Sequence, residues 1–61
     1  MSGAEDALTR AEELLDRLER TRVRLEGTQD PEAAIDILGE LAEIARQVES
    51  ELEQARREAG R

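Results

Sequence analysis

Residues Pro31–Ala59 read PEAAIDILGELAEIARQVESELEQARREA, and their apolar positions decide the fold. One apolar row recurs at alternating intervals of four and three residues, as Ala34, Leu38, Leu41, Ala45, Val48, Leu52, Ala55 and Ala59. A row with this heptad spacing returns to one side of an α-helix, so the stretch is predicted to be a long helix. Such an apolar side has to be covered by another helix.

A second helix is predicted upstream, over about residues 3–26. Ser2 and Glu5 fit a capping box, in which the Ser2 hydroxyl accepts a hydrogen bond from the Glu5 backbone N–H and the Glu5 carboxylate reaches back. Apolar residues return along one face of this stretch, as Ala4, Ala7, Leu8, Ala11, Leu14, Leu15, Leu18 and Leu25. Thr21 and Arg22 interrupt the row, and we expect this turn to be partly exposed. The alternative is that they set the register of a partner helix or bind its carboxylate.

The segment between the two stretches, Gly27-Thr28-Gln29-Asp30-Pro31, has the composition of a helix–helix turn. Gly27 suits a left-handed position after a helix, Asp30 suits an N-cap, and Pro31 suits the first position of the next helix. A loop this short places two helices side by side and antiparallel. We therefore predict an all-α fold with one domain over residues 1–61. It is a coiled-coil-like antiparallel two-helix hairpin with a turn at 27–30 and a second helix over about 31–59.

The composition predicts that this hairpin associates with other helices. A chain of 61 residues is too short to bury a sizeable core alone. Small domains compensate with disulfides, metals or oligomerisation, and the absence of cysteine and histidine leaves oligomerisation. We expect assembly into a bundle, either with copies of itself or with helices of a larger protein.

The second helix carries more apolar surface near the turn than the first helix can cover. Between Ala33 and Val48, isoleucines flank the heptad row on both sides. Exposed apolar surface of this kind is typical of contacts with another chain. The predicted interface residues are Ile35, Ile37, Leu38 and Ile44. Val48 is expected to face Ala11 inside the hairpin instead.

Charge and composition also predict which partners are absent. The net charge of −7 disfavours direct binding of nucleic acid, because binding draws on basic contacts to phosphate. No apolar run approaches the roughly 20 residues that span a bilayer, so no membrane is expected. The N-terminus does not resemble a signal peptide, which makes the cytoplasm the expected location. On the first helix, acids four residues before arginines predict ordinary surface pairs, namely Asp6–Arg10, Glu13–Arg17 and Asp16–Arg20.

No residue pattern in the chain predicts catalysis. Without histidine or cysteine there is no ready base or nucleophile, and the glycines form no phosphate-binding loop. Acidic pairs such as Glu40 and Glu43 lack the Glu-x-x-His motif of di-iron bundles. We expect no catalytic residue, metal, cofactor or small-molecule ligand, and hence no enzyme activity of the chain alone.

Leu25-Glu26-Gly27 leads into the turn, and apolar residues follow it at set intervals, namely Ile35, Ile37, Leu38, Ile44, Ala45, Val48, Leu52 and Ala55. In these residues and their spacing, the second half of the chain resembles the small subunit of bacterial exodeoxyribonuclease VII. The chain departs from that family at Leu38, where the family has tyrosine, and at Leu41, where it has glycine. The phenylalanine that opens the family's first helix is absent as well. The resemblance implies a non-catalytic subunit that docks on long helices of a large nuclease subunit.

Three functions follow from these patterns. The first is a non-catalytic interaction module that acts by helix–helix association, as a homo-oligomer or an accessory subunit. The second is the small subunit of an exodeoxyribonuclease VII-like nuclease. The third is an acidic module that masks a basic surface, whose binding would weaken steeply with salt.

Overall fold

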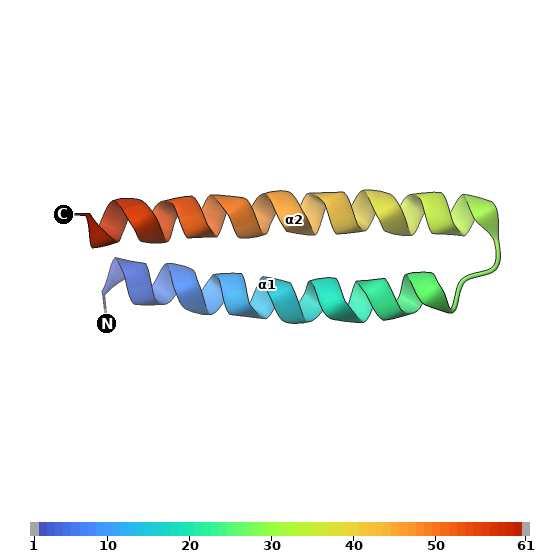
Figure 1. Ribbon diagram of the computed structural model, residues 1–61, viewed down its shortest axis with the longest axis horizontal. Helices are drawn as coiled ribbons and strands as arrows, with labels where there is room; N and C mark the ends of the chain where they lie inside the picture. Colours follow the sequence, from blue (N-terminus) through green and yellow to red (C-terminus); the bar gives the residue numbers. More distant parts are fainter. Residues whose placement is uncertain (1, 61) are drawn as a thin grey trace.

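The computed structural model describes residues 2–60, which form two α-helices joined by a short loop (Figure 1). Helix α1 spans Gly3–Glu26 and helix α2 spans Pro31–Ala59. The two helices lie side by side and antiparallel, so the start of α1 and the end of α2 share one end of the hairpin (Figure 1). The predicted all-α hairpin is confirmed. Residues 1 and 61, which the predicted domain included, lie outside the described residues.

Side-chain caps begin both helices. The Ser2 Oγ accepts a hydrogen bond from the Glu5 backbone N–H at 3.1 Å. The Asp30 carboxylate accepts one from the Glu32 backbone N–H at 3.3 Å, and Pro31 occupies the first turn of α2. Both caps satisfy backbone donors that have no partner within the helix. The predicted caps at Ser2 and Asp30 and the predicted place of Pro31 are therefore confirmed.

The end of α1 differs from the prediction. Gly27 has a right-handed conformation, with φ −86° and ψ −1°, so the predicted left-handed position is wrong. Its N–H donates to the Val23 carbonyl at 3.2 Å, and the Thr28 N–H donates to the Leu25 carbonyl at 3.1 Å. The Thr28 hydroxyl donates to the Arg24 carbonyl at 2.7 Å. These bonds occupy the last carbonyls of α1, and the chain leaves the helix without a left-handed residue.

The helices meet along one heptad row from each, which we call the seam. The seam positions of α1 are Ala4, Ala7, Ala11, Leu14, Leu18, Thr21 and Leu25, all buried or half-buried. Those of α2 are Ala34, Ile37, Leu41, Ile44, Val48, Glu51, Ala55 and Glu58, again buried or half-buried. Ile44, at 2% exposure, is the largest side chain that the hairpin buries fully. Val48 and Ala11 are both buried in this seam.

Two of the four predicted interface residues are in the wrong place. Ile37 and Ile44 are 5% and 2% exposed, so they fill the seam and cannot dock on another chain. The predicted row of α2 shares Ala34, Leu41, Val48 and Ala55 with the seam, but its other members lie one position further along. Ile35 and Leu38 are exposed at 66% and 52%, as the prediction required.

Two glutamates account for the difference between the predicted row and the observed seam of α2. Glu51 and Glu58 continue the row of Ile37 and Ile44 toward the end of α2, where acids argue against burial. In the hairpin, Glu51 bonds to Arg10 of α1, with its Oε1 2.9 Å from the arginine Nε. Glu58 lies against Gly3, where a Cβ would come within 2.8 Å of its Oε2. Each acid is accommodated by the residue of α1 opposite it. Glu51 faces the cation of Arg10, and Glu58 faces Gly3, which has no side chain.

Thr21 is also placed differently from the prediction. It lies in the seam at 5% exposure, whereas this turn was expected to be partly exposed. Its hydroxyl donates to the Arg17 backbone carbonyl at 2.8 Å, which satisfies the buried polar group within its own helix. Arg22, next in the chain, is exposed as expected.

Gly39 offers a simple test of the helical backbone. A Cβ added there meets no atom within 4 Å, and the residue has helical neighbours on both sides. Replacing Gly39 with Ala should therefore stabilise the hairpin by up to about 1 kcal/mol, since glycine costs that much in a helix interior. Thermal unfolding followed by circular dichroism would show a higher midpoint. An unchanged or lower midpoint would indicate that position 39 is packed against something else.

Candidate functional site

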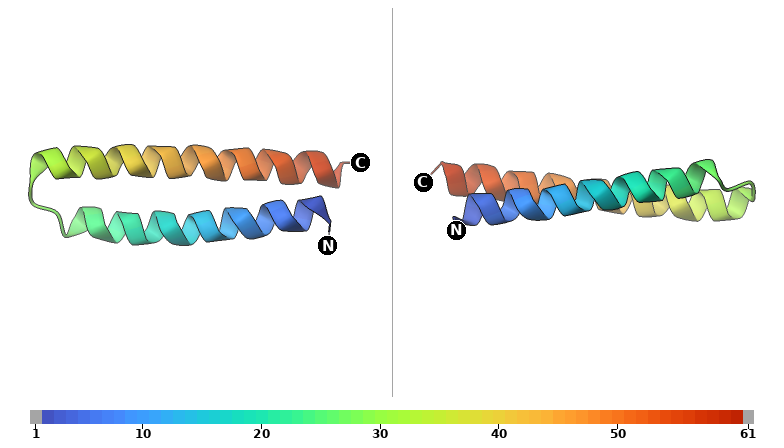
Figure 2. Two further views of the ribbon diagram at one scale, coloured as in Figure 1. Left: turned by 180° about the vertical axis from the view of Figure 1, so that it is seen from behind. Right: turned by 90° about the horizontal axis from the view of Figure 1, so that it is seen from below.

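The hairpin is a single layer of two helices, so it has two flat faces. Its Cα atoms extend over 47 × 14 × 10 Å, and the edge-on view shows the helices overlapping in one thin layer (Figure 2). Domains are ordinarily built from at least two packed layers around a shared core. The seam alone therefore leaves both flat faces of this layer uncovered.

One flat face, which we call the apolar face, carries a row of leucines from both helices. Each residue of its central row comes directly after a seam residue in the sequence. The row consists of Leu8, Leu15 and Arg22 in α1 and of Leu38, Ala45, Leu52 and Ala59 in α2. The helical repeat places these residues beside the half-buried seam leucines, on one side of the layer. Each of the four leucines is about half exposed, and Ile35 beside them is exposed at 66%. The apolar face thus joins exposed leucines to a seam that is only partly closed.

The opposite flat face, the polar face, has a different chemistry. Shallow grooves on it are lined by residues of both helices, including Arg10, Arg17, Arg20, Gln47 and Ser50. Arg10 bonds to Glu51 across this face. The Arg24 Nη2 likewise lies 2.7 Å from the Glu40 Oε2, and so joins α1 to α2. The predicted pairs Asp6–Arg10, Glu13–Arg17 and Asp16–Arg20 are not formed among residues 2–60. Four arginines of α1 line this exposed face, namely Arg10, Arg17, Arg20 and Arg24, and two of them bond to α2.

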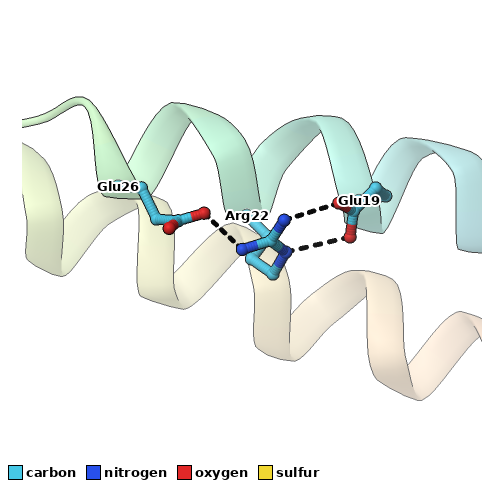
Figure 3. A network of polar contacts seen from close by, with 3 residues as sticks. All are labelled: Glu19, Arg22 and Glu26. Atoms are coloured by element: carbon cyan, nitrogen blue, oxygen red, sulfur yellow. Dashed lines mark hydrogen bonds and ion pairs between the residues drawn. The ribbon is translucent and has the colours of Figure 1, made fainter.

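An ion-pair network lies on α1 where the leucine row is interrupted. The Arg22 guanidinium donates to Glu19 through Nε at 2.9 Å and Nη2 at 2.6 Å, and to Glu26 through Nη1. Figure 3 shows the three side chains together along the surface of α1. Hydrogen bonding to Arg22 holds the pKa of the Glu19 carboxyl below its usual range. Hydrogen bonding to Glu19 and the charge of both carboxylates raise the pKa of Arg22.

Arg22 marks the boundary of the leucine row on α1. Leu8 and Leu15 precede it at seven-residue intervals, so a leucine at position 22 would complete the row. The network keeps the guanidinium bound to its own helix, because both of its acidic partners lie on α1. The apolar face of α1 therefore lies nearer the chain ends. On α2, Ile35 and Leu38 extend the face to the loop.

The sequence predicts only part of the apolar face. Ile35 and Leu38 were predicted as interface residues and are exposed on the apolar face. Leu8, Leu15 and Leu52 were missed, because they were assigned to the seam between the two helices. One feature of the sequence does indicate these residues: each helix has two overlapping apolar rows. A hairpin can cover only one row of each helix, so the other row must be exposed.

The described residues contain no candidate metal site. Between residues 2 and 60, no group of three or more acidic side chains is placed to hold a metal ion. Neither helix in this part of the chain combines the length and apolar character that crossing a membrane requires. In comparisons with known proteins, no family model, curated protein or solved structure matches the chain.

Proposed function

We propose that the chain is a non-catalytic interaction module that works by helix–helix association through its apolar face. The observation that carries this proposal is the row of half-exposed leucines, Leu8, Leu15, Leu38 and Leu52, on one side of the layer. Contiguous apolar surface rimmed by charge is typical of sites where another chain binds. The acids and arginines elsewhere on the hairpin keep the remaining surface hydrated.

The heptad pattern of both helices supports association beyond the hairpin. A two-helix seam needs two apolar positions in each heptad, whereas helices in larger bundles use three. Here the third position is apolar at Leu8 and Leu15 in α1 and throughout the central row of α2. The sequence therefore has the pattern of bundle helices rather than that of an isolated pair.

The exposed surface of the hairpin supports the same proposal. Its accessible area is 4568 Å² for a mass of 6.8 kDa. A compact monomeric protein of that mass exposes about 4,000 Å². The excess of about 600 Å² is what a single layer of helices leaves open when nothing covers it.

An accessory subunit of a larger protein is the alternative form of this function. Several residues that carry the resemblance to the exodeoxyribonuclease VII small subunit, among them Ile35, Leu38 and Leu52, lie on the apolar face. In such an enzyme this face would dock on helices of the large subunit, and the chain alone would have no nuclease activity. Copurification with a large partner would favour this form over self-association.

Two single-cysteine variants test whether the apolar face is covered. Leu38 and Val23 are 52% and 54% exposed in the hairpin. Val23 lies on the side of α1 opposite the seam, away from the apolar face. The chain has no cysteine, so Leu38→Cys and Val23→Cys each introduce a unique thiol. In cells that make the protein, a maleimide should label the thiol at position 38 several-fold more slowly than the one at position 23. Equal labelling rates would contradict the proposed function.

A further inference from the structure

We infer that the partner on the apolar face is a second copy of this chain, stacked face to face into a four-helix bundle with both loops at the same end. In this arrangement α1 of each copy lies against α2 of the other. The inference rests on the proposed function and specifies its partner. It follows from the area, the two faces and the edge charges of the hairpin.

The area that two stacked hairpins would bury fits a stable dimer. Two separate copies expose twice 4568 Å², or about 9,100 Å². A compact protein of twice the mass exposes about 6,600 Å², so full stacking would bury about 2,500 Å² in total. Stable homodimer interfaces start near 2,000 Å². A second copy therefore supplies enough surface without any further partner.

The two faces of the hairpin also limit the assembly to two copies. A second copy presents the same apolar face, which matches in length because both layers are 47 Å long. Contact between identical faces is self-complementary and closes on itself. The polar face points outward in such a pair. Its arginines and Gln47 are charged or polar, so this face offers no apolar surface on which a third layer could pack.

Contacts within the hairpin fix which residues lie at the same level along it. Arg10 pairs with Glu51, and Gly3 lies against Glu58. Because antiparallel helices advance by about 1.5 Å per residue in opposite directions, Leu8 lies level with Leu52. The same register continues toward the loop, where Leu15 is level with Ala45 and Arg22 with Leu38.

Charges along the outer edge of the apolar face favour one orientation of the second copy. On α1 this edge is a row of four exposed glutamates, Glu5, Glu12, Glu19 and Glu26. Arg22 pairs with the last two of them. If α1 lay against α1 of the other copy, two such rows would face each other. Like charges brought together oppose association.

The edge of α2 is a better match for the glutamate row. It consists of Ile35, Ala42, Glu49 and Arg56, so it carries one acid and one base. With α1 against α2 of the second copy, Glu5 comes level with Arg56, and Glu19 and Glu26 come level with apolar residues. Glu12 comes level with Glu49, so one glutamate of the row faces a like charge instead of all four. This orientation is produced by a two-fold axis parallel to the helices, which places both loops at the same end.

Spin labels on single cysteines test both parts of the inference in the purified full chain. Gln29→Cys places the label in the loop. Asp16→Cys places it near the middle of α1, on the side of that helix opposite the seam. Loops at the same end should give an intermolecular distance below about 25 Å at position 29, since packed helices lie about 8–10 Å apart. Sedimentation should give twice the 6.8 kDa chain mass.

The other outcomes overturn the inference. A distance near the 47 Å length of the hairpin at position 29, with a short distance at position 16, would mean that the loops lie at opposite ends. No intermolecular signal at either position, with a monomer mass, would exclude the second copy as partner. If the thiol at position 38 were still protected in cells, the proposed function would stand with a different partner. If the thiol at position 38 were not protected in cells, both the proposed function and the inference of a second copy would be contradicted.

Discussion

An Ile44→Asp variant is expected to lose its helical circular-dichroism signal at every protein concentration, whereas a Leu38→Asp variant keeps it. Ile44 is 2% exposed in the seam between α1 and α2, and Leu38 is half exposed on the apolar face. Loss of a buried isoleucine alone costs about 2–5 kcal/mol, and an unpaired buried carboxylate adds to that cost. A chain of 61 residues has only about 3–9 kcal/mol of stability to lose.

The comparison is sharpest when both substitutions are made in the Gly39→Ala background. That change favours the helix without touching either face, because the added Cβ meets open space. Leu38→Asp should then give a helical hairpin that sediments as a monomer. If both variants remain equally helical, Ile44 does not fill the seam.

The second large effect is expected at Leu52. A Leu52→Glu variant should weaken association by about 100-fold or more, because it places a charge in an apolar contact. In a symmetric pair each copy contributes one such charge, so the interface contains two. Arg57→Glu is the matched control, since the exposed Arg57 belongs to the same end of α2 but lies off the apolar face. Sedimentation across a range of concentrations measures both dissociation constants. Equal weakening by the two variants would place the contact elsewhere.

The hairpin could be predicted because its signals are local. Ser2, Asp30 and Pro31 act within one turn of their own helices, and the short loop leaves no other topology than an antiparallel pair. The left-handed Gly27 was the exception. There, Thr28 and the last backbone N–H groups already bind the free carbonyls of α1, which removes the need for that conformation.

The division of apolar residues between the seam and the exposed face could not be predicted from α2 alone. Its two rows share four residues, and the row through Leu38 and Leu52 contains no acid. The row through Ile44 contains Glu51 and Glu58, and Glu51 is paired with Arg10 of α1. That contact depends on the register between the helices, which no single helix encodes.

The concentration dependence of thermal unfolding tests the central claim most directly, which is that this hairpin associates through its apolar face. If folding is coupled to pairing of two copies, the unfolding midpoint of the wild-type chain should rise by about 10 °C over a hundredfold increase in concentration. In Leu52→Glu the rise should be absent. A wild-type midpoint that stays constant across that range would contradict self-association through this face.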